Sequence, residues 1–284
     1  MPGEVTTAEF DSICSWLRQW CSVMPLQQAA DALREGTLPS RAVTITFDDG
    51  YRDNHGEALP VLKRHGLSAT FFIASGFLDG GRMWNDTVIE SIRRSPSSTL
   101  DLAGTPLADL GSFSLDDDEA RRRAIAALIG RVKYLPPDER QRCVTILAER
   151  ASAQLPTDLM MSRTEVAALH AAGMTIGAHT RNHPILRGLG RDDVATEIEE
   201  NCRDLQSITG RRPSLFAYPN GRPGVDYDDA TRDVVKEFGF SAAVSTAWRA
   251  ARASDDLLQL PRYMPWERTR ARFAIRLAHT LATT

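Results

Sequence analysis

Short apolar segments and amphipathic segments alternate along this chain from Ala42 onward, and this alternation limits the folds open to it. The expected strands are Ala42–Phe47, Ala69–Ala74, Met174–Ala178, Ser214–Ala217 and Ser241–Val244, with a weaker one at Leu257–Leu260. The expected helices are His55–His65, Arg163–Ala171, Arg191–Ile208 and Ala230–Phe238. Glycine follows three of these helices, at the position that a helix C-terminus favours. Strands and helices in alternation predict an α/β fold with a parallel sheet.

Two stretches depart from this alternation. A helical pattern within about 1–38 predicts an N-terminal extension, and three helical patterns lie between about 82 and 156. The three patterns lie near Trp84–Arg94, Leu115–Val132 and Pro137–Gln154, with no convincing core strand between them. A connection of this length is uncommon in a compact domain. We therefore interpret 82–156 as a helical insertion. We therefore expect one domain over 1–284 that carries both additions.

Composition excludes several classes of protein. The net charge of −3 gives no basic surplus for nucleic-acid binding. No apolar stretch reaches the length of a transmembrane helix, and no signal peptide is visible at the N-terminus. The four cysteines show no CxxC spacing and are expected as packed thiols. We expect a cytoplasmic protein, with cell-envelope association and the oligomeric state left open.

Two adjacent carboxylates end the first expected strand. Asp48 and Asp49 follow Ala42–Phe47 and precede Gly50. Such a pair is costly to bury unless it binds a cation or is held where its proton affinity matters. An isolated Asp-Asp-Gly is more often a turn, so this pair alone does not define a site.

Two histidines follow another expected strand. His179 and His183 come directly after Met174–Ala178, and Pro184 disfavours a helical conformation at His183. An isolated His-x-x-x-His is more often surface or helix decoration. However, the carboxyl ends of strands in α/β sheets gather ligand-binding groups at one edge. The occurrence of both motifs at such ends favours a shared site.

The four side chains have the chemistry of a metal site. Two neutral imidazoles and one carboxylate form a common ligand set for Zn²⁺ or a similar ion, with positions left open for water and substrate. The second carboxylate would remain available to take a proton from an activated water molecule. Spacing alone does not say whether Asp48 or Asp49 is the ligand.

Thr46–Gly50 together with His179–His183 resembles the polysaccharide deacetylase family, also called the NodB homology or carbohydrate esterase family 4 group. The resemblance covers about 41–262, with the insertion outside the common core. It implies a distorted (β/α) barrel of the polysaccharide deacetylase type. It also implies a hydrolase that removes N- or O-acetyl groups from sugar polymers with a divalent metal, for which zinc is the expected ion.

The resemblance also assigns roles to the motif residues. It implies that Asp48 is the general base and that Asp49, His179 and His183 are the metal ligands. Thr180 lies where the family has Ser or Thr.

A third family motif, Arg-x-Pro-Tyr, aligns with Ala217–Asn220 and departs from it at two positions. The arginine that orients the base is replaced by Ala217, so the group that tunes Asp48 is unassigned. The tyrosine is replaced by Asn220, whose backbone N–H can still stabilise an oxyanion. The segment also resembles a variant found in one deacetylase branch, which includes biofilm poly-N-acetylglucosamine deacetylases.

The remaining substrate-binding candidates are Tyr51, Tyr218, Pro219 and Arg262. For Arg262, an interaction with Asp48 and a surface ion pair are alternatives. The general acid is unassigned, because His279 fits a structural role and His55 is explained equally well as a helix-start residue.

We therefore expect a metal-dependent hydrolase that removes acetyl groups from N-acetylated amino sugars of a polysaccharide or glycoconjugate. Two alternatives remain open. One is hydrolysis of another non-peptide C–N bond, as in a deformylase or an allantoinase-like amidase. The other is a catalytically weak carbohydrate-binding protein. The expected partner is an acetylated glycan, with no nucleic acid.

Overall fold

A computed structural model of the protein describes residues 5–264, 267 and 269–282. By its internal contacts the chain divides into two compact units. We call Gly80–Leu159 the insert unit. We call the described residues of 5–79 and from 160 onward the sheet unit.

Five parallel strands form the centre of the sheet unit, in the order β3-β4-β7-β8-β9. They are β3 (Thr46–Phe47), β4 (Thr70–Ile73), β7 (Thr175–Ala178), β8 (Leu215–Ala217) and β9 (Ala242–Val244). A separate parallel pair joins β1 (Ser22–Val23) to β2 (Ala42–Val43). The predicted α/β fold of the distorted-barrel type is confirmed, with the parallel sheet forming a half-barrel.

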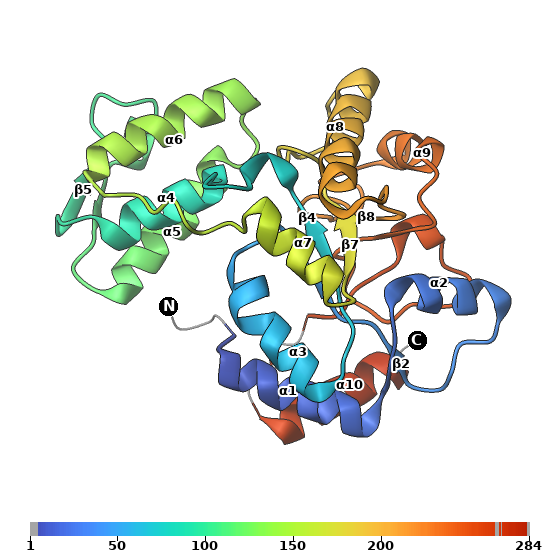
Figure 1. Ribbon diagram of the computed structural model, residues 1–284. Helices are drawn as coiled ribbons and strands as arrows, with labels where there is room; N and C mark the ends of the chain where they lie inside the picture. The colour runs from blue at the N-terminus through green and yellow to red at the C-terminus, as the bar shows by residue number, and fades with distance from the viewer. Residues whose placement is uncertain (1–4, 265–266, 268, 283–284) are drawn as a thin grey trace. The chain divides into compact units, whose positions relative to one another are not determined.

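The helices of the sheet unit lie before, between and after these strands in the chain (Figure 1). They are α1 (Thr7–Trp20), α2 (Leu26–Glu35), α3 (Leu59–His65), α7 (Arg163–Ala171), α8 (Arg191–Thr209), α9 (Asp229–Glu237) and α10 (Arg270–Ala282). Both α7 and α8 contact β7, and α1 contacts α3. Among the described residues, no helix is long and apolar enough to cross a membrane.

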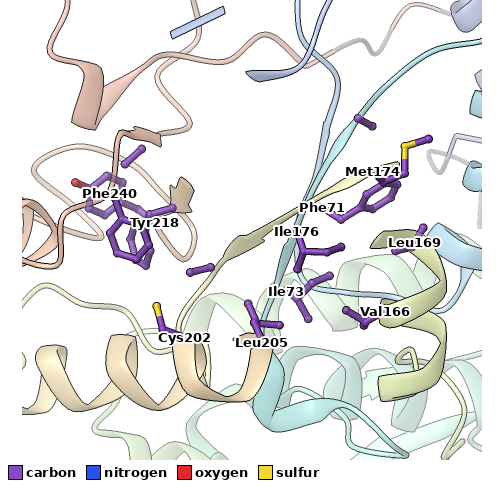
Figure 2. Close-up of a cluster of buried hydrophobic side chains, with 14 of the residues drawn as sticks. Phe71, Ile73, Val166, Leu169, Met174, Ile176, Cys202, Leu205, Tyr218 and Phe240 are labelled. Carbon is purple, nitrogen blue, oxygen red and sulfur yellow. The ribbon is translucent and has the colours of Figure 1, made fainter. Parts of the chain in front are cut away.

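A buried apolar cluster joins the sheet to α7 and α8 (Figure 2). Phe71 of β4 and Ile176 of β7 are paired in register, and Leu169 of α7 lies in the same cluster. On α8, Cys202 and Leu205 complete this side of the core and are fully buried. The packing fixes the strand ends, and therefore the loops that leave them.

The expected strand Ala42–Phe47 is two short strands, β2 and β3, that belong to different sheets. The expected helix His55–His65 is also divided, into a π-helical turn η1 (Asn54–Ala58) and α3. Pro60 explains the second division, because a proline inside a continuous α-helix clashes with the carbonyl of the preceding turn. Pro60 instead lies in the first turn of α3, where its missing N–H costs no intrahelical bond.

The weak strand expected at Leu257–Leu260 is wrong. Leu257–Gln259 forms a 3-10 helix, η4. The Asp256 side chain accepts a hydrogen bond from the Leu258 N–H at 2.9 Å and thereby favours a turn. Only Leu260 returns to the sheet, through an isolated bridge to Val244.

The insert unit contains the three helices expected from the sequence. They are α4 (Trp84–Arg94), α5 (Asp118–Val132) and α6 (Pro137–Ala151). The chain also forms a 3-10 turn, η3 (Ala108–Leu110), and pairs β5 (Thr99–Asp101) with β6 (Ser112–Ser114) antiparallel. The helices bury their own core, which includes Val88, Leu128 and Val144.

Local caps explain where these helices differ from the expected bounds. The helix α5 begins at Asp118 rather than at Leu115, because the Asp117 side chain accepts a hydrogen bond from the Ala120 N–H at 2.7 Å. The helix α6 ends at Ala151, where Ser152 adopts a left-handed conformation. That both units belong to one domain stays a prediction.

Candidate metal centre

Every residue expected at the site lies in the sheet unit, and most follow the carboxyl end of a parallel strand. Asp48 and Asp49 follow β3, and His179 follows β7. Asn220 lies shortly after β8. Because the strands are parallel, these ends share one edge of the sheet, as the sequence predicts.

Asp49, His179 and His183 form one close group. Oδ1 of Asp49 lies 3.3 Å from Nε2 of His179 and 3.2 Å from Nε2 of His183. One possible ligand atom from each residue lies within 4.8 Å of the others. The described residues can therefore offer a divalent ion two nitrogens and one oxygen, a set that suits zinc and similar metals.

The hydrogen bonds of His179 fix which ring nitrogen faces Asp49. The ring is almost fully buried, and its Nδ1–H donates to the Ala217 carbonyl at 2.7 Å. In the neutral imidazole this leaves the lone pair of Nε2 directed toward Asp49. Two electron-rich atoms thus face each other across 3.3 Å. A proton or a cation is required between them, so the residues present fit a metal ion.

The charges of this group depend on one another. Burial alone would raise the pKa of Asp49, but attraction to His183 and His179 outweighs burial and lowers that pKa. Burial alone would lower the pKa of His179, but its contact with Asp49 and the charge of Asp48 raise it instead. The site therefore attracts positive charge even when it binds no ion.

Asp48 is held by Arg262 rather than by a residue of the third motif. The guanidinium donates to both carboxylate oxygens of Asp48 at 2.7 Å, in a bidentate pair. It also donates to the Ser245 carbonyl at 2.9 Å and to the Thr46 hydroxyl at 3.3 Å. The arginine that is missing at Ala217 is thus replaced in space by one that comes 45 residues later.

This pair sets the protonation of Asp48. Burial alone would raise the pKa of Asp48, but the charge and hydrogen bonds of Arg262 outweigh burial and lower that pKa to about 2. The carboxylate is therefore ionised at neutral pH. From the sequence, Arg262 is expected to contact either Asp48 or substrate, or to form a surface ion pair. In the structure its guanidinium bonds to Asp48, Thr46 and Ser245.

Tyr218 is predicted from the sequence to bind substrate, but its side chain lies in the core. The ring stacks on Tyr227 with centroids 3.7 Å apart, and its hydroxyl donates to the Leu258 carbonyl. The side chain is fully buried and offers no surface to a substrate. Pro219 is buried beside it, and Tyr51 is half-buried and bridged to Met160.

The backbone of Asn220 offers a hydrogen-bond donor close to the carboxyl end of β8. Its carbonyl accepts a hydrogen bond from the Thr246 hydroxyl at 2.9 Å. Within the described part of the chain, no hydrogen bond uses its N–H. That donor is therefore available to a ligand.

Four of the candidate residues adopt backbone conformations that residues other than glycine rarely take. Asp49, Thr180, His183 and Asn220 have φ angles of 75°, 60°, 50° and 58°. Each such residue costs about 1–3 kcal/mol and persists only where its surroundings enforce it. Strain of this kind gathers at ligand-binding sites, and here it lies in the loops that carry the metal-binding group.

A cavity of about 550 Å³ lies behind Arg262 and is lined mainly by apolar residues, Phe47 and Leu260 among them. None of Asp49, His179 and His183 lines it. This cavity is therefore separate from the metal-binding group.

Comparison with known proteins identifies the family. The family model of polysaccharide deacetylases matches residues 35–99 and 143–243, which is more than half of the chain. This chain belongs to the polysaccharide deacetylase family. The resemblance inferred from the two motifs is confirmed.

Individual relatives agree with this family. A putative polysaccharide deacetylase of Bacillus subtilis (strain 168), YxkH, is 40% identical over 72 residues, which are 24% of this chain. The chain spans only a quarter of that curated relative.

Solved structures of deacetylases share the fold. IcaB from Ammonifex degensii is 19% identical, with a TM-score of 0.62 over 98% of this chain and 91% of that chain. The deacetylase PplD of Streptococcus pyogenes, solved with acetate, is also 19% identical. Its TM-score is 0.59 over 91% of this chain and 80% of that chain. At this identity the likeness concerns the fold alone.

Sequence reasoning missed the residues that hold the histidines in place. Asn201 and Glu197 on α8 both hydrogen-bond to the backbone of 179–182. A signal was present, because Asn201 occupies a core position among Val194, Ile198 and Leu205. A polar side chain on the apolar face of a helix indicates a specific hydrogen-bond partner.

Proposed function

We propose that the protein is a metal-dependent deacetylase that removes acetyl groups from N-acetylated amino sugars of a polysaccharide or glycoconjugate. The observation that carries this proposal is the Asp49–His179–His183 group beside a carboxylate, Asp48, that is ionised and separately held. Membership of the polysaccharide deacetylase family supports the substrate class.

Asp49, His179 and His183 would hold the ion, and zinc is the ion we propose because nitrogen and carboxylate ligands suit it. A divalent ion held there would polarise the acyl oxygen and make a water molecule more acidic. The Ala217 carbonyl orients His179 by accepting its Nδ1–H, so that Nε2 would be the nitrogen that holds the ion.

Asp48 is the proposed proton acceptor. Because Arg262 occupies it from one side and keeps it ionised, its carboxylate accepts the proton of the attacking water. The protonated carboxyl group of Asp48 then returns this proton to the leaving nitrogen as the C–N bond breaks.

Asn220 completes the proposed site. Its backbone N–H donates to the oxygen that becomes negatively charged when water adds to the acetyl carbon. A backbone donor is unaffected by the replacement of the motif tyrosine. The proposed oxyanion donor is therefore kept although the motif tyrosine is absent.

Acetate release from acetylated amino-sugar oligomers tests the proposal, with β-1,4- and β-1,6-linked N-acetylglucosamine oligomers as the first probes. We expect zinc-dependent release by the wild-type protein and none by Asp49→Asn. The control is Asp192→Asn, which removes an exposed carboxylate from the first turn of α8. Full activity after exhaustive removal of metal would overturn the proposal.

A further inference from the structure

The helix α8 carries two polar residues toward the loop that holds the histidines. We call residues 179–183 the histidine loop. The apolar face of α8 includes Val194, Ile198 and Leu205, and Asn201 interrupts this face although it is fully buried. One turn earlier on the helix lies Glu197.

Asn201 links the histidine loop to the neighbouring strand. Its side-chain oxygen accepts a hydrogen bond from the His179 N–H at 3.0 Å. Its amide nitrogen donates to the Ile73 carbonyl and to the Ser75 hydroxyl, both at 2.9 Å. The Asn201 side chain therefore connects the carboxyl end of β7, where His179 lies, to the carboxyl end of β4.

Glu197 holds the middle of the same loop. Its carboxylate accepts hydrogen bonds from the backbone N–H groups of Arg181 and Asn182 at 3.0 and 2.8 Å. It also accepts one from the Asn182 side chain at 2.8 Å. These residues lie between Thr180 and His183, the two residues with left-handed backbone conformations. The carboxylate therefore contacts the part of the loop where the chain is most constrained.

The opposite side of the loop is equally confined. The Gly76 N–H donates to the Arg181 carbonyl at 2.8 Å. A Cβ atom added at Gly76 would lie 2.7 Å from Asn182 Oδ1 and 2.8 Å from the Arg181 carbonyl oxygen. The histidine loop is thus packed between α8 and the turn η2 (Ser75–Phe77).

We propose that Glu197 and Asn201 are positioning residues that hold His179 and His183 in the geometry required to bind the metal ion. Neither residue is proposed as a ligand, and both act through the backbone of the histidine loop. Without these bonds, the strained residues Thr180 and His183 relax and the two imidazoles separate. The inference rests on the proposed metal site.

Zinc affinity of the purified full chain tests this inference, measured by competition with a chromogenic chelator. We expect Glu197→Ala and Asn201→Leu to weaken zinc binding by about 10–100-fold, the usual effect of removing groups that orient metal ligands. Glu197→Gln keeps an acceptor oxygen for the loop N–H groups, so we expect it to recover most of the affinity. Gly76→Ala should also weaken binding, because it displaces the loop from the other side.

The matched control is Glu199→Ala on the same helix. Glu199 pairs with Arg203 and Arg212, away from the histidine loop, so we expect unchanged zinc affinity. The Co²⁺-substituted proteins provide a second readout, because the visible absorption of Co²⁺ reports ligand geometry. We expect an altered spectrum for Glu197→Ala and the wild-type spectrum for Glu199→Ala.

The outcomes separate this inference from the proposed function. If the wild-type protein binds no zinc, both the proposed metal site and the proposed function are contradicted. Zinc binding by the wild type together with unchanged affinity and spectrum in Glu197→Ala would overturn the positioning role alone. If the Asn201→Leu variant does not fold, the Glu197→Ala variant decides the question, because Glu197 is only partly buried. Equal loss in Glu197→Ala and Glu199→Ala would also contradict the proposal.

Discussion

Arg262 and Asp48 form a bidentate ion pair across 214 residues of sequence, with both N···O distances at 2.7 Å. Arg262 thus supplies the charged partner of Asp48 that the third motif lacks, because this chain has Ala217 there. The low pKa of Asp48, about 2, follows from this pair.

Removal of Arg262 should change the pH dependence of activity. A base works only when ionised, and the guanidinium keeps the pKa of Asp48 low. In Arg262→Met that attraction is lost and burial raises the pKa of Asp48. The acid limb of the kcat/KM profile should therefore move to higher pH, so that the loss of activity grows as pH falls.

The controls for this prediction are Arg262→Lys and Arg232→Met. Lysine keeps a positive charge without the bidentate geometry, so its profile should lie between those of the wild type and Arg262→Met. Arg232 pairs with acidic residues at the surface, and its loss should leave the profile unchanged. An acid limb at the wild-type pH in Arg262→Met would contradict the role of Arg262.

Substitution of Asn220 should show whether its backbone N–H or its side chain stabilises the oxyanion. Asn220 has a φ angle of 58°, which glycine adopts without strain. Asn220→Gly keeps the N–H, so kcat should stay within about ten-fold of the wild-type value if that donor is what stabilises the oxyanion. A loss of 100-fold or more, about 2.7 kcal/mol, would instead assign the function to the side-chain amide.

Gly177 tests the packing beneath the site. A Cβ atom there would lie 2.4 and 2.5 Å from two ring carbons of Phe72, which is fully buried. Gly177→Ala should therefore destabilise the protein by about 1–3 kcal/mol, measured by urea denaturation. Gly56→Ala is the control, because a Cβ atom there meets nothing within 4 Å. Equal stabilities of the two variants would show that Phe72 moves freely.

The sequence predicted the parallel α/β fold and the grouping of Asp49 with His179 and His183, because strand periodicity and two motifs carry local signals. Other features depend on contacts between distant residues. Arg262 pairs with Asp48 after a segment in which Leu260 forms a bridge to β9 and the Arg262 guanidinium bonds to the Ser245 carbonyl. Tyr218 lies in the core because Tyr227 and Leu258 surround it. Neither contact leaves a periodic pattern in the sequence.

The division of work between the adjacent aspartates is the central claim, and zinc content measured on the same Asp48→Asn sample as acetate release tests it directly. We predict that this variant keeps about one zinc ion per chain while its rate of acetate release falls by about 10²–10⁴-fold. Asp49→Asn should lose both. Loss of zinc from Asp48→Asn, or wild-type acetate release by it, would contradict the assignment of Asp48 as base and Asp49 as ligand.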